Sequence, residues 1–467
     1  MRVRLLGHSI HVSIVVLALV EVLLFACALR AAEYIRFDLL SEPGFRPLTH
    51  SWLRASLFSL AIFTSYFALG LYTARQRARA FGISVRIALG VFVGFIAIAV
   101  VFYLLPELKV GRGVTAIAAA FALIWSSMAR WVFSRFVDIQ TFKKKVLVFG
   151  CGERARAFAR LRRRSDRRGY NLVGFVCAAG EGNCTHLGET LSAQDGLLAL
   201  CKRLGVDEVV VAMEDRRREF PARDLLECRM LGIEVVDLVT FLERETGSIY
   251  LDGLSPSWMI FGGGFRRDNL RQFTVGLVNF LASVLLLAVT LPVMLLTALA
   301  IRIEDGYRSG GIFYRQERIG LHGKPFELLK FRSMRVDAES GGTPQWAQKN
   351  DPRVTRVGAL IRRTRIDELP QLLNVLRGQM SFVGPRPERP HFVAELQEAI
   401  PYYAQRHSVK PGITGWAQLC YPYGASEQDA QRKLQYDLYY VKNNSLLFDL
   451  AILVQTVEVV FMGKGAR

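Results

Sequence analysis

A run of arginines leads into two adjacent carboxylates, Asp367 and Glu368, in residues 362–371. Pro370 and Gly378 suit the beginning and the end of a short helix, so Asp367 is expected to be its N-cap. A capping carboxylate needs no further role. However, a helix N-terminus also attracts phosphate, and arginines neutralise phosphate oxygens. A carboxylate there can bind Mg²⁺ or attack phosphorus, so both interpretations stay open.

Two further segments could present basic side chains to an anion. Residues 381–390 contain several prolines around Arg386, and this restricted backbone would hold the arginine in a set direction. A rigid connector with solvated charges explains the segment equally well. Lys330 and Arg332 alternate at the end of an apparent strand, where a solvated strand face is the commoner explanation. Residues 410–416 are typical of a turn that leads into a strand.

The composition indicates a basic membrane protein with soluble parts. Lys and Arg number 60 against 41 Asp and Glu, the net charge is +19, and 51% of the residues are hydrophobic. Beside membrane spans, this basic excess favours an anionic membrane surface or a phosphate-rich substrate over nucleic acid. No zinc-type or RNA-binding signature is present. The 7 cysteines are irregularly spaced, which predicts reduced thiols and no disulfide framework.

Four apolar runs fill residues 1–140, at 11–30, 50–72, 83–105 and 114–136. Each approaches the about 20 residues that a helix needs to cross a bilayer. Glu21 interrupts the first run, which we interpret as a span and not as a cleaved signal peptide. Basic residues predict that the N-terminus, the second loop and everything after residue 140 face the cytoplasm. These residues are Arg2, Arg4, Arg75, Arg77, Arg79, Arg86, Lys143, Lys144 and Lys145.

Residues 141–262 alternate between strand and helix patterns, which predicts a doubly wound α/β domain. Its first strand runs into a glycine turn with Gly150, Gly152 and Ala155 at the spacing of a dinucleotide fingerprint. The acid expected at the end of the second strand is absent, because Cys177 occupies that place. This argues against a redox NAD site.

Residues 272–301 contain no charged side chain and are long enough to span a bilayer, yet Pro292 lies inside this run and basic residues flank both ends. A fifth span would place the remaining chain outside the cytoplasm. A helix that bends at Pro292 and returns to the same face satisfies charge and topology together, although an ordinary kinked span explains the residues equally well. Residues 446–461 are also apolar, but Asp449 and Glu458 favour a core or interfacial helix there.

Three motif-rich stretches in residues 264–467 resemble the bacterial polyprenyl-phosphate glycosylphosphotransferases, and more narrowly their large exopolysaccharide-type members. They read GIFYRQERIGLHGKPFELLKFRSM, NDPRVTRVGALIRRTRIDELPQLLNVLRGQMSFVGPRPERP and KPGITGWAQL. Residues 241–261 are similar to members found beside exosortase-associated loci. The resemblance implies a multi-domain membrane protein. Its parts would be a four-helix transmembrane bundle (1–140), a Rossmann-like α/β domain of regulatory or structural role (141–262), and an α/β phosphoglycosyl transferase domain (263–467) with a re-entrant helix at about 272–301.

The resemblance also implies a reaction. A phosphosugar would pass from a UDP-sugar to an aspartate, with release of UMP, and then to polyprenyl (undecaprenyl) phosphate. This would begin the synthesis of an exopolysaccharide or a related glycan. The nucleophile and the ligand of an expected Mg²⁺ map to Asp367. The other catalytic positions map to Glu368, Lys330 and Arg362. Substrate-binding positions map to Arg332, Pro385, Arg386, Pro387 and Asp437, and the break in the re-entrant helix maps to Pro292.

The expected partners are the UDP-sugar, the polyprenyl phosphate and the lipid bilayer, without nucleic acid, and the family suggests a homodimer. The expected location is the bacterial inner membrane, multi-pass, with both soluble domains in the cytoplasm. Many relatives carry an Asn-Gly-Arg turn after the Gly-Trp-Ala-Gln segment, whereas residues 419–424 of this chain lack that arginine, which puts sugar or nucleotide selection there in doubt.

Two other functions compete with this interpretation. One is a membrane-bound nucleotide-sugar oxidoreductase or dehydratase that uses the middle domain. The missing ribose-binding acid and the lack of a Tyr-x-x-x-Lys pair argue against it. The other is a non-catalytic nucleotide-binding scaffold. The intact set of Asp367, Glu368, Lys330 and Arg386 argues against that.

Overall fold

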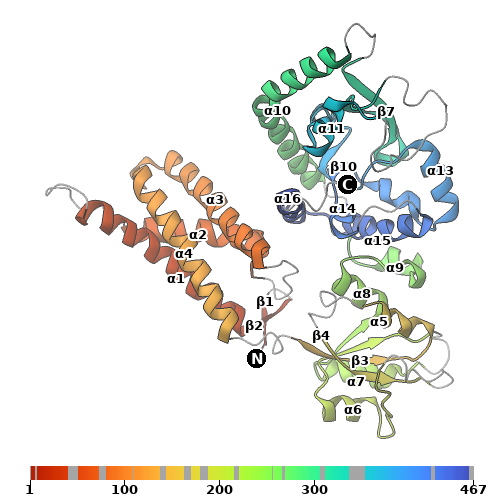
Figure 1. The fold of residues 1–467 in the computed structure, drawn as a ribbon. Helices are drawn as coiled ribbons and strands as arrows, with labels where there is room; N and C mark the ends of the chain where they lie inside the picture. Colours follow the sequence, from red (N-terminus) through yellow and green to blue (C-terminus); the bar gives the residue numbers. More distant parts are fainter. Residues whose placement is uncertain are drawn as a thin grey trace. The chain divides into compact units, whose positions relative to one another are not determined.

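A computed structural model describes residues 2–5, 8–39, 51–72, 80–108, 110–136, 143–161, 170–178, 188–214, 220–254, 256–265, 269–305, 311–335, 353–421 and 426–461. These residues form two compact units, Met1–Thr246 and Gly247–Arg467. The second unit begins before residue 263, where the sequence places the start of the catalytic domain. Figure 1 shows the elements of both units, and each unit is described by itself.

Each of the four N-terminal apolar runs forms a helix. A short antiparallel pair, β1 (Arg2–Leu5) and β2 (His8–His11), comes before them. The helices are α1 (Val12–Tyr34), α2 (Ser51–Ala68), α3 (Ala80–Leu104) and α4 (Arg112–Phe136). Among the described residues, α1, α3, α4 and the later α10 are long and apolar enough to cross a membrane, whereas α2 is outside that set. Arg75, Arg77 and Arg79 lie outside the described residues.

The charge that interrupts the first apolar run has a partner in the bundle. Arg130 of α4 donates from Nε and Nη2 to the two carboxylate oxygens of Glu21 in α1, at 2.7 and 2.8 Å. Its Nη1 donates to the carbonyl oxygen of Leu71 at 3.0 Å. A buried charge is tolerated in an apolar bundle when it is paired in this way. Glu21 is therefore consistent with a packed membrane helix.

The middle domain contains a four-stranded, fully parallel sheet in the order β4-β3-β5-β6. Its strands are β3 (Lys144–Phe149), β4 (Tyr170–Val176), β5 (Glu208–Val211) and β6 (Glu234–Asp237). Helices α6 (Leu197–Leu204) and α7 (Ala222–Met230) cover one face. Helices α5 (Ala157–Arg160) and α8 (Leu238–Thr246) cover the other, where Phe158 stacks on Phe241 (Figure 1). Both faces of the sheet are therefore buried, as expected for a parallel sheet.

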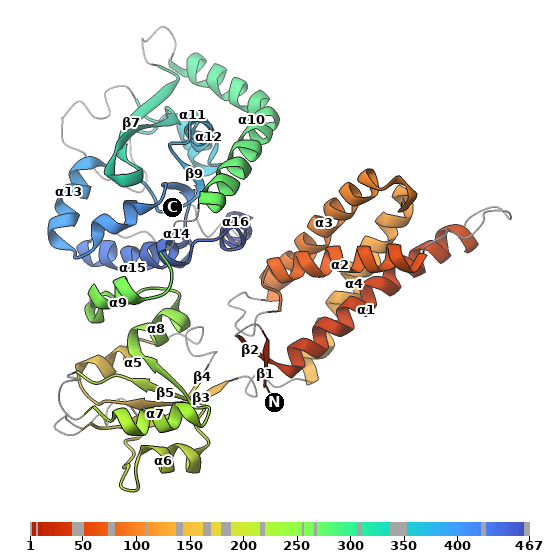
Figure 2. The same ribbon diagram turned by 180° about the vertical axis from the view of Figure 1, so that it is seen from behind.

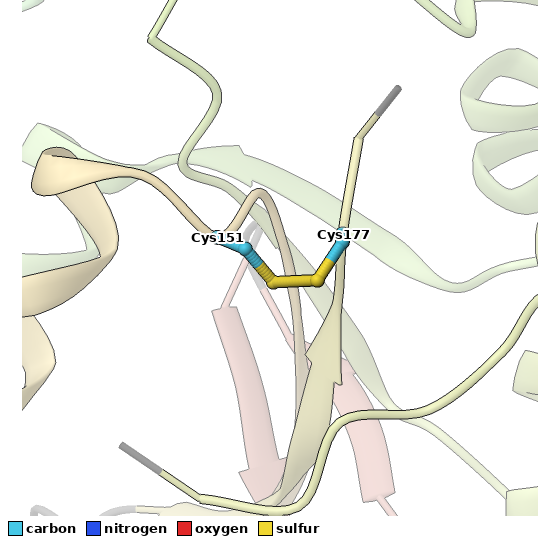
Figure 3. The surroundings of a disulfide bond; sticks show 2 residues. All are labelled: Cys151 and Cys177. Atoms are coloured by element: carbon cyan, nitrogen blue, oxygen red, sulfur yellow. A yellow bond between two sulfur atoms is a disulfide. The ribbon is translucent and has the colours of Figure 1, made fainter. Parts of the chain in front are cut away.

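The glycine turn after β3 is closed by groups of the domain itself. The backbone N–H of Glu153 donates to the carboxylate of Glu214, and a Cβ at Gly152 would lie 2.3 Å from that carboxylate. Cys151 in the turn forms a disulfide with Cys177 at the end of β4 (Figure 3). The prediction that all cysteines are free thiols is therefore wrong for this pair. The fold brings the ends of two neighbouring parallel strands together, which the sequence spacing does not reveal.

The second unit combines small sheets with helices. Its strands form an antiparallel hairpin, β7 (Phe313–Ile319) with β8 (Pro325–Phe331), and a parallel pair, β9 (Ser381–Val383) with β10 (Gly412–Thr414). Its helices are α9 (Pro256–Phe261), α10 (Asn269–Asp305), α11 (Arg356–Arg363), α12 (Gln371–Leu376), α13 (Pro390–Ala399), α14 (Trp416–Cys420), α15 (Glu427–Asn443) and α16 (Leu446–Phe461).

Helix α10 is one helix of 37 residues with Pro292 inside it, and it bends part-way along its length (Figures 1 and 2). Proline inside a helix removes a hydrogen bond and favours such a bend. Both arms of α10 contact the same unit. In the first arm, the side chain of Asn279 donates to Ser381 Oγ at 2.8 Å. At the far end, Glu304 accepts from the backbone N–H of Arg356, the first residue of α11, at 2.7 Å.

Candidate active site

Strand β8 and the short helix α12 bring Lys330 close to Glu368. Lys330 Nζ lies 3.6 Å from Glu368 Oε1. The fully buried Asn374 of α12 ties the two elements together, because its side chain accepts from Leu329 N at 3.0 Å and donates to Glu327 O at 2.7 Å. Asn374 was not singled out from the sequence, where an asparagine in a short apolar helix gives no sign that it bridges to a strand.

Asp367 lies in a single 3₁₀ turn, Ile366–Glu368, which follows Arg365 in the left-handed region at φ 59°. Helix α12 begins only at Gln371, with Pro370 as its N-cap. The prediction that Asp367 caps this helix is therefore wrong, because the 3₁₀ turn lies between the carboxylate and the helix. The predicted end is confirmed, since Gly378 follows α12 with φ 73° and donates to Val375 O.

The two adjacent carboxylates meet different electrostatic surroundings. Burial raises the pKa of Asp367, and the neighbouring Glu368 raises it further, against the charges of Lys330, Arg365 and Arg362. Burial also opposes the charge on Glu368, but Lys330, Arg386 and Arg365 hold its pKa below the ordinary value. Glu368 is thus an ionised group engaged with cations. Asp367 is 8% exposed, and its Oδ1 has no hydrogen-bond partner among the described residues.

The free oxygen of Asp367 is suited to a cation or an electrophile. No group of three or more His, Cys, Asp or Glu side chains capable of holding a metal occurs in the part of the chain that the structure describes. Mg²⁺ does not require such a group, because it is commonly held by one or two carboxylates together with substrate phosphates and water. An orphaned buried carboxylate oxygen therefore fits one protein ligand to Mg²⁺.

The proline-rich loop after β9 brings Arg386 near the acidic pair, where its charge contributes to the low pKa of Glu368. The loop starts from a close approach of two backbones: Gly384 N donates to Thr414 O at 2.9 Å, and a Cβ at Gly412 would lie 2.1 Å from Gly384 N. The predicted turn and strand at residues 410–416 are confirmed as β10, and glycine is required in that strand for the approach. Pro385, Arg386 and Pro387 border a small pocket.

The remaining predicted residues lie in other surroundings. Arg362 is in the last turn of α11, and its charge reaches Asp367. Arg332 follows β8, where burial and the charge of Arg302 lower its pKa. Asp437 is 2% exposed on α15 and is paired with Arg406, a residue that no sequence signal had distinguished from the other arginines. Residues 422–424, where the Asn-Gly-Arg turn is missing, lie outside the described residues.

A buried carboxylate with a free oxygen, surrounded by lysine and arginine, is suited to the transfer of a phosphate-linked group, because the cations neutralise phosphate oxygens that would otherwise repel the nucleophile. Helix α10 of the same unit is long and apolar enough to cross a membrane. Together, the fold and the site define a membrane-associated transferase of phosphorylated substrates.

Comparisons with known proteins agree with this class. Residues 270–463 match the family described as bacterial sugar transferase. The chain is 31% identical over 453 residues to the UDP-glucose:undecaprenyl-phosphate glucose-1-phosphate transferase of Xanthomonas campestris pv. campestris, which covers 91% of each chain. The chain therefore belongs to the bacterial sugar transferases that act on polyprenyl phosphate, and it is a sugar-phosphate transferase.

Two further relatives match over shorter stretches. The UDP-N-acetylgalactosamine-undecaprenyl-phosphate N-acetylgalactosaminephosphotransferase of Aeromonas hydrophila is 40% identical over 245 residues, which cover 52% of this chain and 56% of that protein. The undecaprenyl-phosphate glucose phosphotransferase of Komagataeibacter xylinus is 42% identical over 333 residues, or 69% of this chain and 60% of that protein. Each match thus spans little more than half the length of the relative. The sugar in the name of the first relative is N-acetylgalactosamine, and in the name of the second it is glucose.

Proposed function

We propose that this protein transfers a phosphosugar from a UDP-sugar to undecaprenyl phosphate through a covalent intermediate on Asp367. An Asp367 carboxylate oxygen attacks the sugar-linked phosphorus, the bond from that phosphorus to the bridging oxygen breaks, and UMP leaves. A phosphate oxygen of the lipid then attacks the same phosphorus, which releases the carboxylate and leaves a sugar diphospholipid. The observation that carries this proposal is the buried, unpartnered Asp367 Oδ1 beside the Glu368–Lys330 pair.

The cations of the site have separable tasks in this reaction. Lys330 and Arg362 oppose the negative charge around Asp367, so a diphosphate can approach it. Arg386, on the proline-rich loop after β9, binds a phosphate of the nucleotide. Glu368 orients Lys330 through their ion pair. A bound Mg²⁺, with Asp367 as its protein ligand, would withdraw negative charge from the diphosphate.

We further infer that α10 is re-entrant and that both soluble domains face the cytoplasm at the bacterial inner membrane. The bend at α10 and the contacts of both its arms with one unit support a helix that enters and leaves on the same face. We assign a Rossmann-like fold to the middle domain. Its role is structural or regulatory, because Glu214 and the Cys151–Cys177 disulfide already occupy its glycine turn. The reaction begins the synthesis of an exopolysaccharide or a related glycan. The protein acts as a homodimer.

Asp367→Asn should abolish turnover. We expect UMP release by the purified full-length protein, supplied with undecaprenyl phosphate and Mg²⁺, to fall at least about a thousandfold, because the amide cannot act as the nucleophile. The assay is run over a panel of UDP-sugars, which also identifies the donor. Glu395→Gln, at a side chain that is 61% exposed, is the matched control and should leave the rate unchanged. Wild-type rates in Asp367→Asn would rule out the covalent mechanism.

A further inference from the structure

The loop that carries Arg386 is held through its backbone carbonyl oxygens. Pro385 O accepts from Gly412 N at 3.0 Å, and Arg386 O accepts from Arg406 Nη2 at 3.0 Å. Pro387 O accepts from Arg318 Nη1 at 3.2 Å. Prolines have no N–H to donate, so the carbonyl oxygens are the main backbone groups through which this loop can be fixed. Two of the three donors are guanidinium groups from other elements.

Arg406 is itself held rigidly. It is 5% exposed, and its Nε and Nη2 lie 3.1 and 2.8 Å from Asp437 Oδ2. Its Nη1 donates to Tyr403 Oη at 2.7 Å. Burial opposes its charge, but Tyr403 and Asp437 raise the pKa of the guanidinium above the ordinary value, so it is charged at neutral pH. Asp437 thereby fixes the plane of the guanidinium, and with it the hydrogen bond to Arg386 O.

Arg318 donates to the next carbonyl oxygen of the loop, that of Pro387. It lies on β7 with its side chain 15% exposed, and its Nη2 donates to Gln316 Oε1 at 2.6 Å. The Glu388 carboxylate is 3.7 Å away. Burial lowers the pKa of Arg318 to about 10, which leaves it charged at neutral pH. Its donor to Pro387 O is therefore a charged group.

The charge of Arg386 reaches the reaction centre, while its carbonyl oxygen accepts from Arg406. The Arg386 charge contributes to the electrostatics of both Glu368 and Lys330. With the backbone held at two successive carbonyl oxygens, the guanidinium of Arg386 is presented in one direction before substrate binds. Preorganisation of this kind reduces the cost of ordering a binding group.

We propose that Arg406 and Arg318 are positioning residues that clamp the Arg386 loop, and that Asp437 acts by orienting Arg406, without contacting the substrate. The role given to Arg386 rests on the proposed function. A simple stabilising ion pair between Arg406 and Asp437 would not need to donate to the carbonyl oxygen of Arg386, the residue whose charge reaches the reaction centre. The clamp therefore predicts that Arg406 matters for catalysis only through Arg386.

The test uses the purified full-length protein and compares Arg406→Lys, Asp437→Asn and Arg318→Lys with Arg315→Lys. Arg315 lies on the same strand as Arg318, and its side chain is 67% exposed, so it is the matched control. We expect each clamp variant to raise KM for the UDP-sugar about tenfold, as for loss of a charged hydrogen bond. Over the same series kcat should stay within about threefold, because the nucleophile is intact.

A double-mutant cycle decides whether Arg406 acts through Arg386. Arg406→Lys added to Arg386→Ala should cause no further loss of kcat/KM, because the group being positioned is already gone. Effects that multiply, or KM values equal to that of Arg315→Lys, would overturn the clamp. If Arg406→Lys or Asp437→Asn fails to fold, the more exposed Arg318→Lys carries the same cycle.

Hydrogen exchange separates failure of the clamp from failure of the proposed function. Backbone amides in residues 384–389 should exchange faster in Arg406→Lys and Asp437→Asn than in the wild type or Arg315→Lys, with or without turnover. A wild-type protein that releases no UMP from any UDP-sugar contradicts the proposed function, while faster exchange in the variants still supports the clamp. Unchanged exchange contradicts the clamp even if the enzyme is active.

Discussion

Adjacent residues of the same chemical type have different surroundings in this protein. Asp367 is buried, with an oxygen that has no hydrogen-bond partner among the residues that the structure describes, whereas Glu368 lies 3.6 Å from Lys330 and 3.4 Å from Arg365. Consecutive residues in a tight turn point in different directions, so Lys330 and Arg365 form ion pairs with Glu368, while their charges also reach Asp367. A third carboxylate, Asp437, is set apart again by its buried pairing with Arg406. The three carboxylates therefore differ at the residue scale: Asp367 is the proposed nucleophile, Glu368 is paired with Lys330, and Asp437 is paired with Arg406.

Asp449 provides a prediction on stability. It is 8% exposed on α16, and burial raises its pKa to about 6 although Tyr440 Oη donates to it at 2.7 Å. Because its pKa is higher in the folded state, the stabilising effect of the bound proton is complete below the ordinary value of 3.8 and is lost as the pH rises through about 6. Asp449→Asn should therefore stabilise the protein above pH 6, by roughly 3 kcal/mol at most.

Thermal unfolding of the detergent-solubilised protein from pH 5 to pH 8 measures this effect. The increase in Tm for Asp449→Asn should be largest at pH 8 and should shrink towards pH 5, where the wild-type carboxyl is becoming neutral. Glu398→Gln, at an exposed position, is the control and should show no such trend. A Tm that falls at pH 8 in Asp449→Asn would mean that the carboxylate charge is needed there.

Helix α10 joins the membrane to the active site at the scale of the element. Its first arm meets β9, the strand that leads into the Arg386 loop, through Asn279 and Ser381. Its far end caps α11, the helix that carries Arg362, through Glu304. A bent helix that is held at both arms places two segments of the site relative to one membrane anchor.

Topology reporters can test whether α10 is re-entrant. A reporter inserted at Gly263 and another at the C-terminus should both read cytoplasmic, because the bent helix returns to the face that it entered. As a control, reporters on either side of α3 should read opposite faces, since that helix is expected to cross. Opposite readings on the two sides of α10 would show an ordinary span and remove the re-entrant proposal.

At the scale of the whole molecule, the chain combines a membrane bundle, an α/β middle domain and a second unit that carries the candidate active site. The membrane bundle contains the Glu21–Arg130 pair, the middle domain is built on a parallel sheet, and the second unit contains the candidate catalytic residues. The middle domain closes its own glycine turn, because a carboxylate lies where a phosphate would bind in a dinucleotide site. This arrangement favours a structural or regulatory part over a second catalytic centre.

The Cys151–Cys177 pair tests the cytoplasmic placement of this domain. A reducing cytosol opens most disulfides, so we expect the Cys151–Cys177 disulfide that the structure holds to be reduced in growing cells and to form again after treatment with a diamide-type oxidant. Acid quenching, denaturation and maleimide-polymer labelling give the redox state as a gel shift. The double variant Cys151→Ser with Cys177→Ser should show no shift from this pair. A disulfide that persists in untreated cells would place the domain in an oxidising compartment.

Much of the architecture follows from local sequence patterns. The long apolar runs, the strand that leads into the glycine turn, the end of α12 at Gly378 and the strand at residues 412–414 are all present where expected. These features depend on hydrophobic periodicity and on backbone preferences within a few residues, so a single sequence reveals them. The misassigned N-cap at Asp367 is a local error, because one 3₁₀ turn changes which residue begins the helix.

Asp367, Glu368, Lys330 and Arg386 could be singled out from the sequence by residue type, motif and family resemblance. Their order along the chain does not tell which of them meet. Tertiary packing decided that Lys330 pairs with Glu368, that Asp437 pairs with Arg406, and that Cys151 meets Cys177. Each of these contacts joins different elements of the fold, and its energy depends on distance and burial, which no local pattern of residues specifies.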